Sequence, residues 1–217
     1  MKFDISTVAD QWDLLAFGLM VTLKYTVYTC AIGLTLGLLI ALMQLSSWKI
    51  LRYASRAWVE FFRNIPLLVL LLWTYYALPI FLQIEIDKEV AGVLGLGFYA
   101  SGFYAEILRA GVQSIDRGQT DAGIVLGMTY GQRMRRIILP QALRRMVPPL
   151  MGQTIMQLKN TTLLSVLTIP DLLYQASYIS SRSYRPMEVY TVIGVMFILM
   201  LIPLSMISRW FERKGAA

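Results

Sequence analysis

The stretch "QTDAGIVLGMTYGQRMRRIILPQALRR", residues 119–145, decides the fold of this chain. It carries five arginines and lies between long apolar runs. Gly127 stands where a glycine commonly ends a helix. The apolar residues before it, Ala122, Val125 and Leu126, follow helical spacing. The stretch therefore predicts a short helix that stops at a tight turn.

A second helix is predicted directly after that turn. Thr129 followed three residues later by Gln132 matches a capping box, so a helix should start at Tyr130 and run until Pro140. The result is a helical hairpin over residues 117–145. A basic connector would explain the arginines alone. The length and punctuation of the stretch favour a docking element for a soluble partner.

The bulk composition indicates an integral membrane protein. Of the 217 residues, 57% are hydrophobic and 15% are charged, whereas soluble domains carry about a quarter charged residues. The chain has no histidine and one cysteine, so a metal site rich in these ligands is excluded. Cys30 lies in an apolar run and is interpreted as a packing residue. The N-terminus lacks a basic leader, so we expect the first apolar run to remain in the mature chain.

Five apolar runs are long enough to be considered as membrane spans. A spanning helix needs about 20 mainly apolar residues. The runs cover residues 14–45, 65–83, 90–108, 146–170 and 187–208. The prediction is an all-α integral membrane protein with five transmembrane helices in one domain, residues 1–217. Prolines near the predicted span starts, Pro66, Pro148 and Pro149, should cost little there, whereas Pro79 should kink its span.

The basic residues predict the orientation. Segments 46–63, 109–145 and 208–217, taken as cytoplasmic loops and tail, hold four, seven and three of the 20 lysines and arginines. Positive residues favour the cytoplasmic side, which places the N-terminus outside and the C-terminus inside. This placement accounts for the net charge of +7 without a nucleic-acid partner.

Motifs for catalysis or nucleotide binding are missing from the sequence. Neither a phosphate-binding G-x-x-x-x-G-K-[ST] loop nor a G-x-S-x-G nucleophile motif occurs. The glycines of "GVLGLGFYASG", residues 92–102, lie inside the third span and are expected to allow close helix packing. Five helices make a thin wall, so a second membrane subunit is expected.

The fourth span carries polar residues on one helix face. They are Gln153, Gln157, Asn160, Thr161, Ser165 and Thr168. Such a stripe must avoid lipid, so it either hydrogen-bonds neighbouring helices or lines a translocation path, and we favour the path. Lys159 points away from the stripe and needs a partner, either Glu106 or an anionic substrate.

Two further charged positions lie near the cytoplasmic ends of spans. Glu106 and Arg109 are i,i+3 neighbours, and we favour a structural pair over substrate contact. Arg63 precedes Pro66 at the inner mouth of the second span. Its role is open between positive-inside anchoring and gating.

The hairpin resembles a known signature. "TDAGIVLGMTYGQRMRRIILPQA", residues 120–142, is similar to the EAA motif of permease subunits in binding-protein-dependent ABC importers. The sequence has Asp121 where the motif has Glu, and Gly123 in place of its second Ala. The likeness implies that the hairpin docks an ATPase. The implied docking residues are Asp121, Ala122, Gly123, Leu126, Gly127, Arg133, Arg136, Leu139 and Pro140.

The resemblance extends over nearly the whole chain. "FFRNIPLLVLLLWTYYALP" (61–79), "YAEILRAGVQSI" (104–115), "LPQALRRMVPPL" (139–150) and "LKNTTLLSVL" (158–167) look like the polar amino-acid uptake subfamily. Within that subfamily, "RGQ…LGMT…IILPQA", which starts at residue 117 and ends at residue 142, looks closest to the glutamate/aspartate importers. Five spans with a periplasmic N-terminus agree with a type I importer permease. The implied substrate path contains Arg63, Glu106, Gln153, Gln157, Lys159, Asn160, Thr161 and Ser165.

The resemblance also implies the partners of the chain. A cytoplasmic dimer of ATP-binding subunits would hold ATP and Mg²⁺, so this chain itself needs no cofactor and is not an enzyme. A second homologous permease subunit, with a heterodimer favoured, and a periplasmic amino-acid-binding protein would complete the complex in a bacterial inner membrane. The alternatives are a stand-alone secondary transporter, which generally needs more helices, and a non-pumping scaffold or channel subunit.

Overall fold

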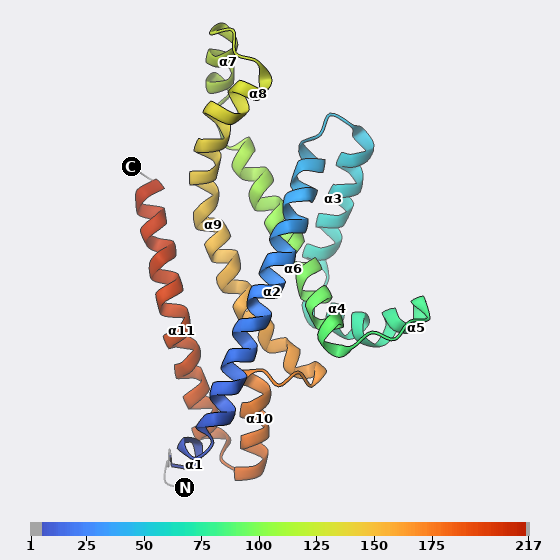
Figure 1. Cartoon of the computed structure of the whole chain (residues 1–217), viewed down its shortest axis with the longest axis vertical. Coiled ribbons are helices and arrows are strands. Elements are labelled where there is room, and N and C mark those ends of the chain that lie inside the picture. The colour runs from blue at the N-terminus through green and yellow to red at the C-terminus, as the bar shows by residue number, and fades with distance from the viewer. Residues whose placement is uncertain (1–5, 216–217) are drawn as a thin grey trace.

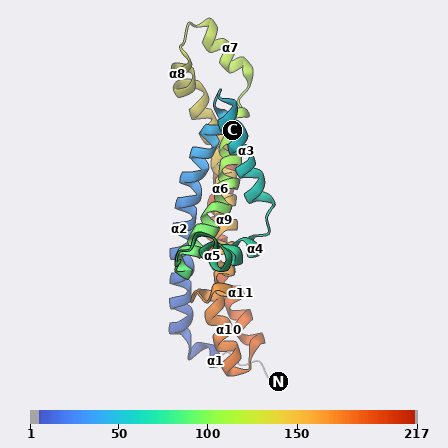
Figure 2. The ribbon, with the colours of Figure 1, turned by 90° about the vertical axis from the view of Figure 1, so that its right-hand side faces the viewer.

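The computed structural model describes residues 6–215, and every regular element in that range is a helix. The long helices lie side by side in a bundle that is narrow when viewed from its edge (Figures 1 and 2). The elements are α1 (Ser6–Ala9), α2 (Trp12–Leu45), α3 (Lys49–Asn64), α4 (Leu67–Leu72), the π-helical turn η1 (Trp73–Ala77), α5 (Leu78–Leu82), α6 (Lys88–Gln113), α7 (Arg117–Val125), α8 (Tyr130–Arg133), the π-helical turn η2 (Met134–Ile138), α9 (Leu139–Asn160), the 3₁₀ helix η3 (Thr161–Leu167), α10 (Leu172–Ser183) and α11 (Pro186–Gly215).

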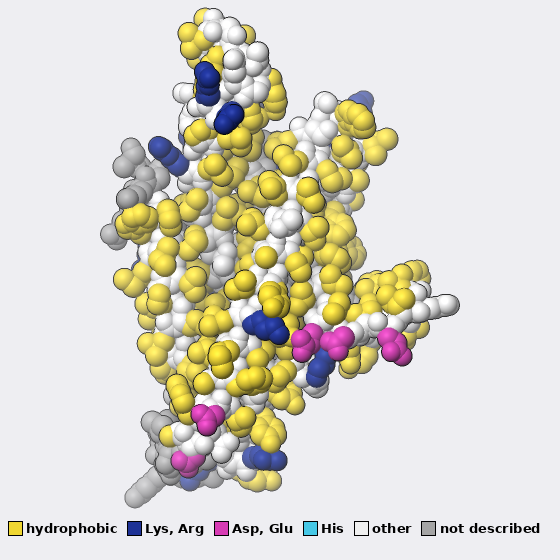
Figure 3. All heavy atoms as spheres, in the orientation of Figure 1, with side chains coloured by type: hydrophobic (Ala, Val, Ile, Leu, Met, Phe, Trp, Pro, Cys, Tyr) yellow, Lys and Arg dark blue, Asp and Glu magenta, His cyan; other side chains and the backbone are white. Residues whose placement is uncertain are grey.

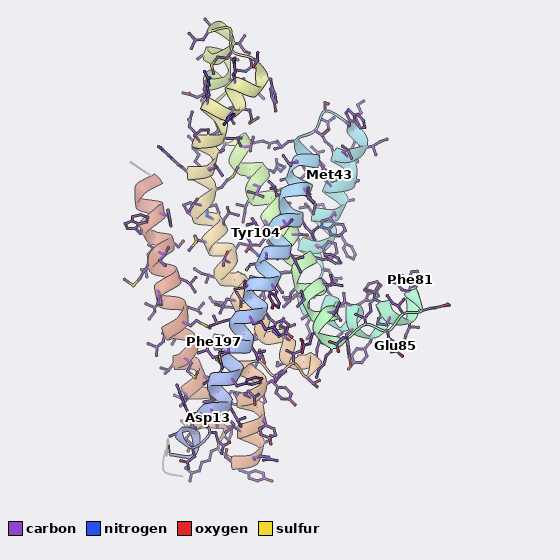
Figure 4. All side chains as sticks on the ribbon, viewed as in Figure 1. Asp13, Met43, Phe81, Glu85, Tyr104 and Phe197 are labelled. Atoms are coloured by element: carbon purple, nitrogen blue, oxygen red, sulfur yellow. The ribbon has the colours of Figure 1, made fainter. Side chains whose placement is uncertain are left out.

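The centre of the bundle is the contact between α2 and α6. A Cβ atom added at Gly37 of α2 would lie 2.7 Å from the Cβ of Tyr104, and one added at Gly97 of α6 would lie 2.7 Å from Ile32. Only glycine permits backbones this close. Tyr104, midway along the bundle in Figure 4, is fully buried, and its hydroxyl lies 3.1 Å from the Thr154 hydroxyl of α9. The predicted close packing around residues 92–102 is confirmed.

Within residues 6–215, three helices are long and apolar enough to cross a membrane. They are α2, α6 and α11, the last over Pro186–Phe211. The bent pair formed by α3 and the segment Leu67–Leu82 adds a fourth if it is counted as one span. The helix α9 is not in this set, so the first, third and fifth predicted spans are confirmed by length and composition, and the count of five stays a prediction.

The second predicted span differs most from the structure. Residues 46–63, expected as a cytoplasmic loop, mostly form α3, which packs against α2 and α6. A bend of 105° then separates α3 from the following segment. It falls at Ile65, which is extended because Pro66 disfavours helical backbone in the residue before it. The next segment, α4–η1–α5, starts against the bundle, because α4 and η1 pack on α6. Its last part, α5, forms an arm that projects sideways from the bundle (Figure 1).

The helix α9 begins earlier than predicted. It starts at Leu139 rather than near residue 146, so Pro148 and Pro149 lie inside it and not at its start. The helix contacts both α6 and α11, and tertiary packing of this kind offsets the local cost of a proline within a helix. In the described part of the chain, α1 and the 117–145 hairpin lie at opposite ends of the molecule (Figure 1).

The kind of side chain on the surface changes along the long axis of the molecule. Figure 3 shows hydrophobic side chains covering most of the middle of the visible face, with basic side chains on the hairpin. Long helices with apolar sides, together with a basic hairpin at one end, are typical of a membrane protein. The chain is therefore an integral membrane protein whose hairpin stands beyond the apolar belt.

Candidate functional site

The first hairpin helix, α7, is closed at both ends by local hydrogen bonds. Its cap residue Asp116 accepts a bond from the backbone two residues further on. At the other end Gly127 takes φ +69°, a left-handed conformation that suits glycine. Its N–H donates to the Ile124 carbonyl at 2.9 Å, and the Met128 N–H donates to the Gly123 carbonyl at 3.0 Å. These two bonds make a Schellman motif, so the predicted helix stop is confirmed.

The second hairpin helix begins as predicted but does not end as predicted. Thr129 and Gln132 form both bonds of a capping box. The expected stop at Pro140 is wrong, because the helix continues into α9. The π-helical turn η2 precedes the proline, and the Leu139 N–H donates to the Met134 carbonyl. This wider turn lets the helix pass Pro140, which lacks an N–H of its own.

The far end of α7 presents apolar side chains to solvent. We define the hairpin tip as Ile124, Val125 and Leu126, whose exposed fractions are 54%, 86% and 76%. Asp121 and Ala122, one turn earlier, are also exposed. A contiguous apolar patch on a projecting element, rimmed by polar residues, is typical of a protein interaction site.

Two of the predicted docking residues lie inside the hairpin. A Cβ atom at Gly123 would lie 2.8 Å from Cγ and Cδ of Arg133, so only glycine lets the two helices pack this closely. The Arg133 guanidinium donates to the Met128 carbonyl at 2.8 Å. Both residues therefore hold the turn together. The other predicted docking residues are exposed: Asp121, Ala122, Leu126, Gly127, Arg136, Leu139 and Pro140.

A polar hollow of about 630 Å³ lies beside the second hairpin helix. Gln132, Arg135 and Arg136 line it together with Thr129 and Gly131. Arg135 was not among the residues predicted from the sequence. The spacing 132, 135 and 136 places these side chains on one helix face, which is the signal that could have identified it.

Some polar side chains of α9 are buried against neighbouring helices. Gln157 is fully buried, and its amide Nε2 donates to the Leu96 carbonyl of α6 at 3.3 Å. Thr161 is also fully buried. Burial of these two residues is what the helix-packing alternative expects, and the assignment of the set to a substrate path stays a prediction. Gln153 and Asn160 are half-buried, and each has a buried amide nitrogen with no hydrogen-bond partner among the described residues.

The predicted stripe does not continue along one helix, as the sequence had suggested. After Asn160 the chain tightens into η3, and Thr168 then takes φ +56°. The hydroxyls of Thr161, Thr162 and Ser165 each donate to the carbonyl three residues earlier. Such bonds favour a 3₁₀ turn at a helix end. Ser165 therefore lies beyond α9, on η3, and not on its polar face.

The charged residues of α6 pair with each other. The Arg109 Nε donates to a Glu106 carboxylate oxygen at 3.0 Å, and a second nitrogen of the same guanidinium contacts the other oxygen. The predicted structural pair is confirmed. Lys159 is exposed and forms no ion pair within the described residues. Of the two partners left open for it, Glu106 is paired with Arg109 instead.

Arg63 lies in a pocket with this ion pair. Its guanidinium lies 5.5 Å from the centre of the Phe103 ring, a cation–π arrangement. The pocket has a volume of about 430 Å³ and lies among α3, α6 and the end of α2. We call it the charged pocket. Its polar lining consists of Gln44, Arg56, Glu60, Arg63, Glu106, Arg109 and Gln113.

Comparison with known proteins agrees with this arrangement. The chain is 36% identical over 222 residues to the glutamate/aspartate import permease protein GltK of Escherichia coli O6:H1 strain CFT073, with 99% of each chain covered. It is 36% identical over 211 residues to the probable glutamine ABC transporter permease protein GlnM of Bacillus subtilis strain 168, with 97% of each covered.

A solved structure also matches the whole fold. A crystal structure of an amino acid ABC transporter with histidines contains a chain that is 37% identical to this one, with a TM-score of 0.93. The match covers 99% of this chain and 100% of that one. The family pattern of binding-protein-dependent transport system inner membrane components matches residues 33–215. This chain therefore belongs to that family and is a permease of an amino-acid ABC importer.

Proposed function

We propose that the chain is the permease subunit of an ATP-driven importer that carries glutamate or aspartate across a bacterial inner membrane. In this proposal five segments cross the bilayer, with the N-terminus in the periplasm and the hairpin and C-terminus in the cytoplasm. The observation that carries it is the exposed apolar tip of the projecting hairpin. A stand-alone transporter or a scaffold has no need of such a dock.

The hairpin would act as the coupling element. The tip residues would seat in a groove of a separate ATPase subunit, which would hold ATP and Mg²⁺. Closure of the ATPase dimer would move the tip, and the Schellman turn and the Gly123–Arg133 packing would transmit this movement into α9 without bending. The membrane helices would thereby be biased between two arrangements.

Two arguments support the proposed substrate: the names of similar proteins and the charge of one residue on α9. GltK is named for glutamate and aspartate, whereas GlnM is named for glutamine. An exposed lysine on α9, Lys159, favours an anionic cargo, because a cation at membrane depth costs free energy unless it meets an anion. Gln153 and Asn160, with their unpartnered amide nitrogens, would add donors beside it.

The shape of the helix bundle supports two further partners, a second permease subunit and a binding protein. The described bundle is a thin wall (Figure 2), so a second homologous permease subunit, in a heterodimer, would be needed to enclose a path. A periplasmic binding protein loaded with the amino acid would dock at the end opposite the hairpin.

The test is amino-acid uptake by proteoliposomes that contain the complete complex and its loaded binding protein. We expect glutamate or aspartate uptake that requires ATP, and we expect Val125→Asp with Leu126→Asp to lower it about tenfold or more, because charges would replace buried apolar contacts. The control is Val125→Leu, which keeps the patch apolar and should retain uptake. Uptake driven by an ion gradient without ATP would establish a secondary transporter instead, and ATP-driven uptake of another amino acid would reject the substrate.

A further inference from the structure

The turn between α2 and α3 fixes where α3 begins. Residues 46–48 form this turn, and α3 then runs back alongside α2 (Figure 1). The Ser46 N–H donates to the Met43 carbonyl at 3.2 Å, and the Trp48 N–H donates to the Ser46 hydroxyl at 3.2 Å. The turn lies at the same end of the molecule as the hairpin (Figure 1). Under the proposed function this is the cytoplasmic end, where α2 leaves the bilayer.

The first two turns of α3 are basic and have no acidic neighbour in the sequence. Residues 41–59 contain Lys49, Arg52 and Arg56 and no aspartate or glutamate. Arg56 faces the charged pocket. Among the described residues, the side chains of Lys49 and Arg52 have neither an ion pair nor a hydrogen bond. Both cations can therefore bind an anion from outside the chain.

A tyrosine completes a group of three hydrogen-bond donors at this position. Lys49, Arg52 and Tyr53 are spaced i, i+3 and i+4, so they are neighbours on the surface of α3. We call these three residues the basic corner. Lys49 and Tyr53 are exposed, and Arg52 is half-buried. An ammonium, a forked guanidinium and a phenolic hydroxyl together suit the oxygens of a phosphate group.

An apolar surface continues along α3 from the basic corner. It consists of Ile50, Ala54, Ala57 and Phe61, all of which are exposed. The exposed fractions of Ile50 and Phe61 are 82% and 56%. These two residues are about 16 Å apart along the helix axis, since a helix rises 1.5 Å per residue. That length is close to half of the hydrocarbon thickness of about 30 Å, so it matches the acyl chains of one leaflet.

Phosphate donors at one end and apolar surface along the length match an amphiphile. A free phosphate ion would use the donors and leave the apolar surface uncovered. Trp48, which is 72% exposed, and Tyr53 are of the two residue types enriched at headgroup level. A zwitterionic headgroup would bring a cation toward two positive side chains. We propose that the basic corner binds the phosphodiester of an anionic phospholipid in the cytoplasmic leaflet, with an acyl chain along α3.

This site differs from the general excess of positive charge on the cytoplasmic side. Diffuse attraction is shared by every basic residue near the surface and has no fixed stoichiometry. A site at the basic corner binds one lipid per copy of the chain and depends on two particular cations. The choice of leaflet rests on the orientation in the proposed function, whereas the binding itself does not.

The test is native mass spectrometry of the complete complex titrated with phosphatidylglycerol or with phosphatidylcholine. We expect the native complex to bind phosphatidylglycerol more tightly. Lys49→Gln with Arg52→Gln should weaken phosphatidylglycerol binding about tenfold or more, with one tightly bound lipid lost per copy of the chain, and should leave phosphatidylcholine binding unchanged. The matched control is Arg117→Gln with Arg135→Gln, which removes the same charge from the hairpin, beyond the apolar belt, and should leave both affinities unchanged.

Each other result would overturn the proposal. Equal affinity of the native complex for the two lipids would do so, and so would an equal loss in the corner and hairpin variants. If the corner variant does not assemble, the native complex still decides, because the preference for phosphatidylglycerol should fall as salt concentration rises. A preference that salt does not change would rule out recognition by charge.

A competition experiment distinguishes a lipid site from a phosphate site. We expect soluble glycerol phosphate to leave phosphatidylglycerol bound, because it lacks the acyl chain, and displacement of the lipid would overturn the proposal. None of these measurements uses ATP or an amino acid. Failure here therefore leaves the proposed function intact, and failure of ATP-driven uptake would leave a lipid-binding result intact.

Discussion

Asp171 caps α10 from a position that solvent does not reach. Its exposed fraction is 0%, and one carboxylate oxygen accepts the Tyr174 N–H at 2.8 Å. The other oxygen has no hydrogen-bond partner among the described residues. Burial raises the pKa of Asp171 from its ordinary value of 3.8 to about 7, against the opposing effect of the backbone donors. The protonated acid is therefore the form that the fold prefers.

This pKa predicts how stability changes with pH. Because the folded pKa lies above the unfolded value, the contribution is fully present below about pH 4 and is lost as pH rises to about 7. Asp171→Asn keeps an acceptor for the Tyr174 N–H and removes the charge. We expect the variant to be more stable than the native protein at pH 8, by about 1–2 kcal/mol. Thermal unfolding of the purified complex between pH 5 and pH 8 measures this. Asp116→Asn, at the exposed cap of α7, is the control, and equal pH slopes in all three proteins would contradict the prediction.

Two glycines of the hairpin differ only in their surroundings. A Cβ atom at Gly123 would lie 2.8 Å from the Arg133 side chain, whereas one at Gly131 would meet nothing within 4 Å. We expect Gly123→Leu to separate the two hairpin helices and lower ATP-driven uptake at least tenfold with normal membrane insertion. Gly131→Ala should retain uptake. Proteoliposome transport at matched protein content compares them, and full activity of the Leu variant would show that the packing is not needed for coupling.

At the scale of elements, the hairpin was predictable because its signals are local. Gly127 fixes a left-handed turn, and Thr129 with Gln132 supplies a capping box, each within a few residues. The limits of α3 and α9 depend on distant contacts. The charges of α3 made it look like a loop, because the α2 and α6 surfaces that it packs against are not evident from its own sequence.

A π-helical turn precedes a proline in two places in the chain, and in both the helix continues beyond the proline. The π-helical turns η1 and η2 each end two residues before a proline, Pro79 and Pro140. Each adds one residue to a helical turn, which rotates everything beyond it. The sequence predicted that Pro79 would kink its helix and that Pro140 would end its helix. Both predictions assume regular α-helical hydrogen bonding and do not allow for a wider π-helical turn before the proline. The angular placement of the hairpin on α9 therefore depends on η2.

This dependence gives a prediction for Pro140→Ala. The new N–H can donate to the Arg136 carbonyl, so the helix can relax toward regular α geometry and change the direction of the hairpin. We expect unchanged or higher thermal stability, by about 1 kcal/mol, with a several-fold lower ratio of amino acid transported to ATP hydrolysed. Pro79→Ala, in the arm and far from the hairpin, should keep that ratio. A Pro140→Ala complex with native stoichiometry would remove η2 from the coupling path.

At the scale of the whole molecule, composition predicted the membrane class but not the arrangement of helices. The three most apolar helices could be identified from hydropathy, and the Gly-rich run of α6 indicated close packing. The charged pocket could not be predicted, because it joins residues 44, 56–63 and 106–113 through tertiary packing. Arg63 and Glu106 were chosen singly as path residues, and the sequence offered no reason to place them around one pocket.

The arm has large apolar side chains that the rest of the chain leaves uncovered. Figure 4 shows Phe81 and Glu85 near its end, away from the bundle. Ile80 and Phe81 are each 80% exposed, and side chains of this size gain about 1.5–3 kcal/mol each on burial. A bent, projecting segment is poorly placed to cross lipid alone, so we expect it to pack on the second permease subunit.

Phe81→Asp tests this packing. We expect the variant to lower pairing of the permease subunits about tenfold or more, since a carboxylate would replace buried aromatic surface. Native mass spectrometry of complexes released from nanodiscs counts the paired fraction, and membrane content of the single subunit reports insertion. Phe81→Leu keeps an apolar side chain and should pair normally. Normal pairing by the Asp variant, with normal insertion, would instead place the arm at the lipid–water interface, where a carboxylate is tolerated. The contact between the permease subunits would then have to be formed by the long helices.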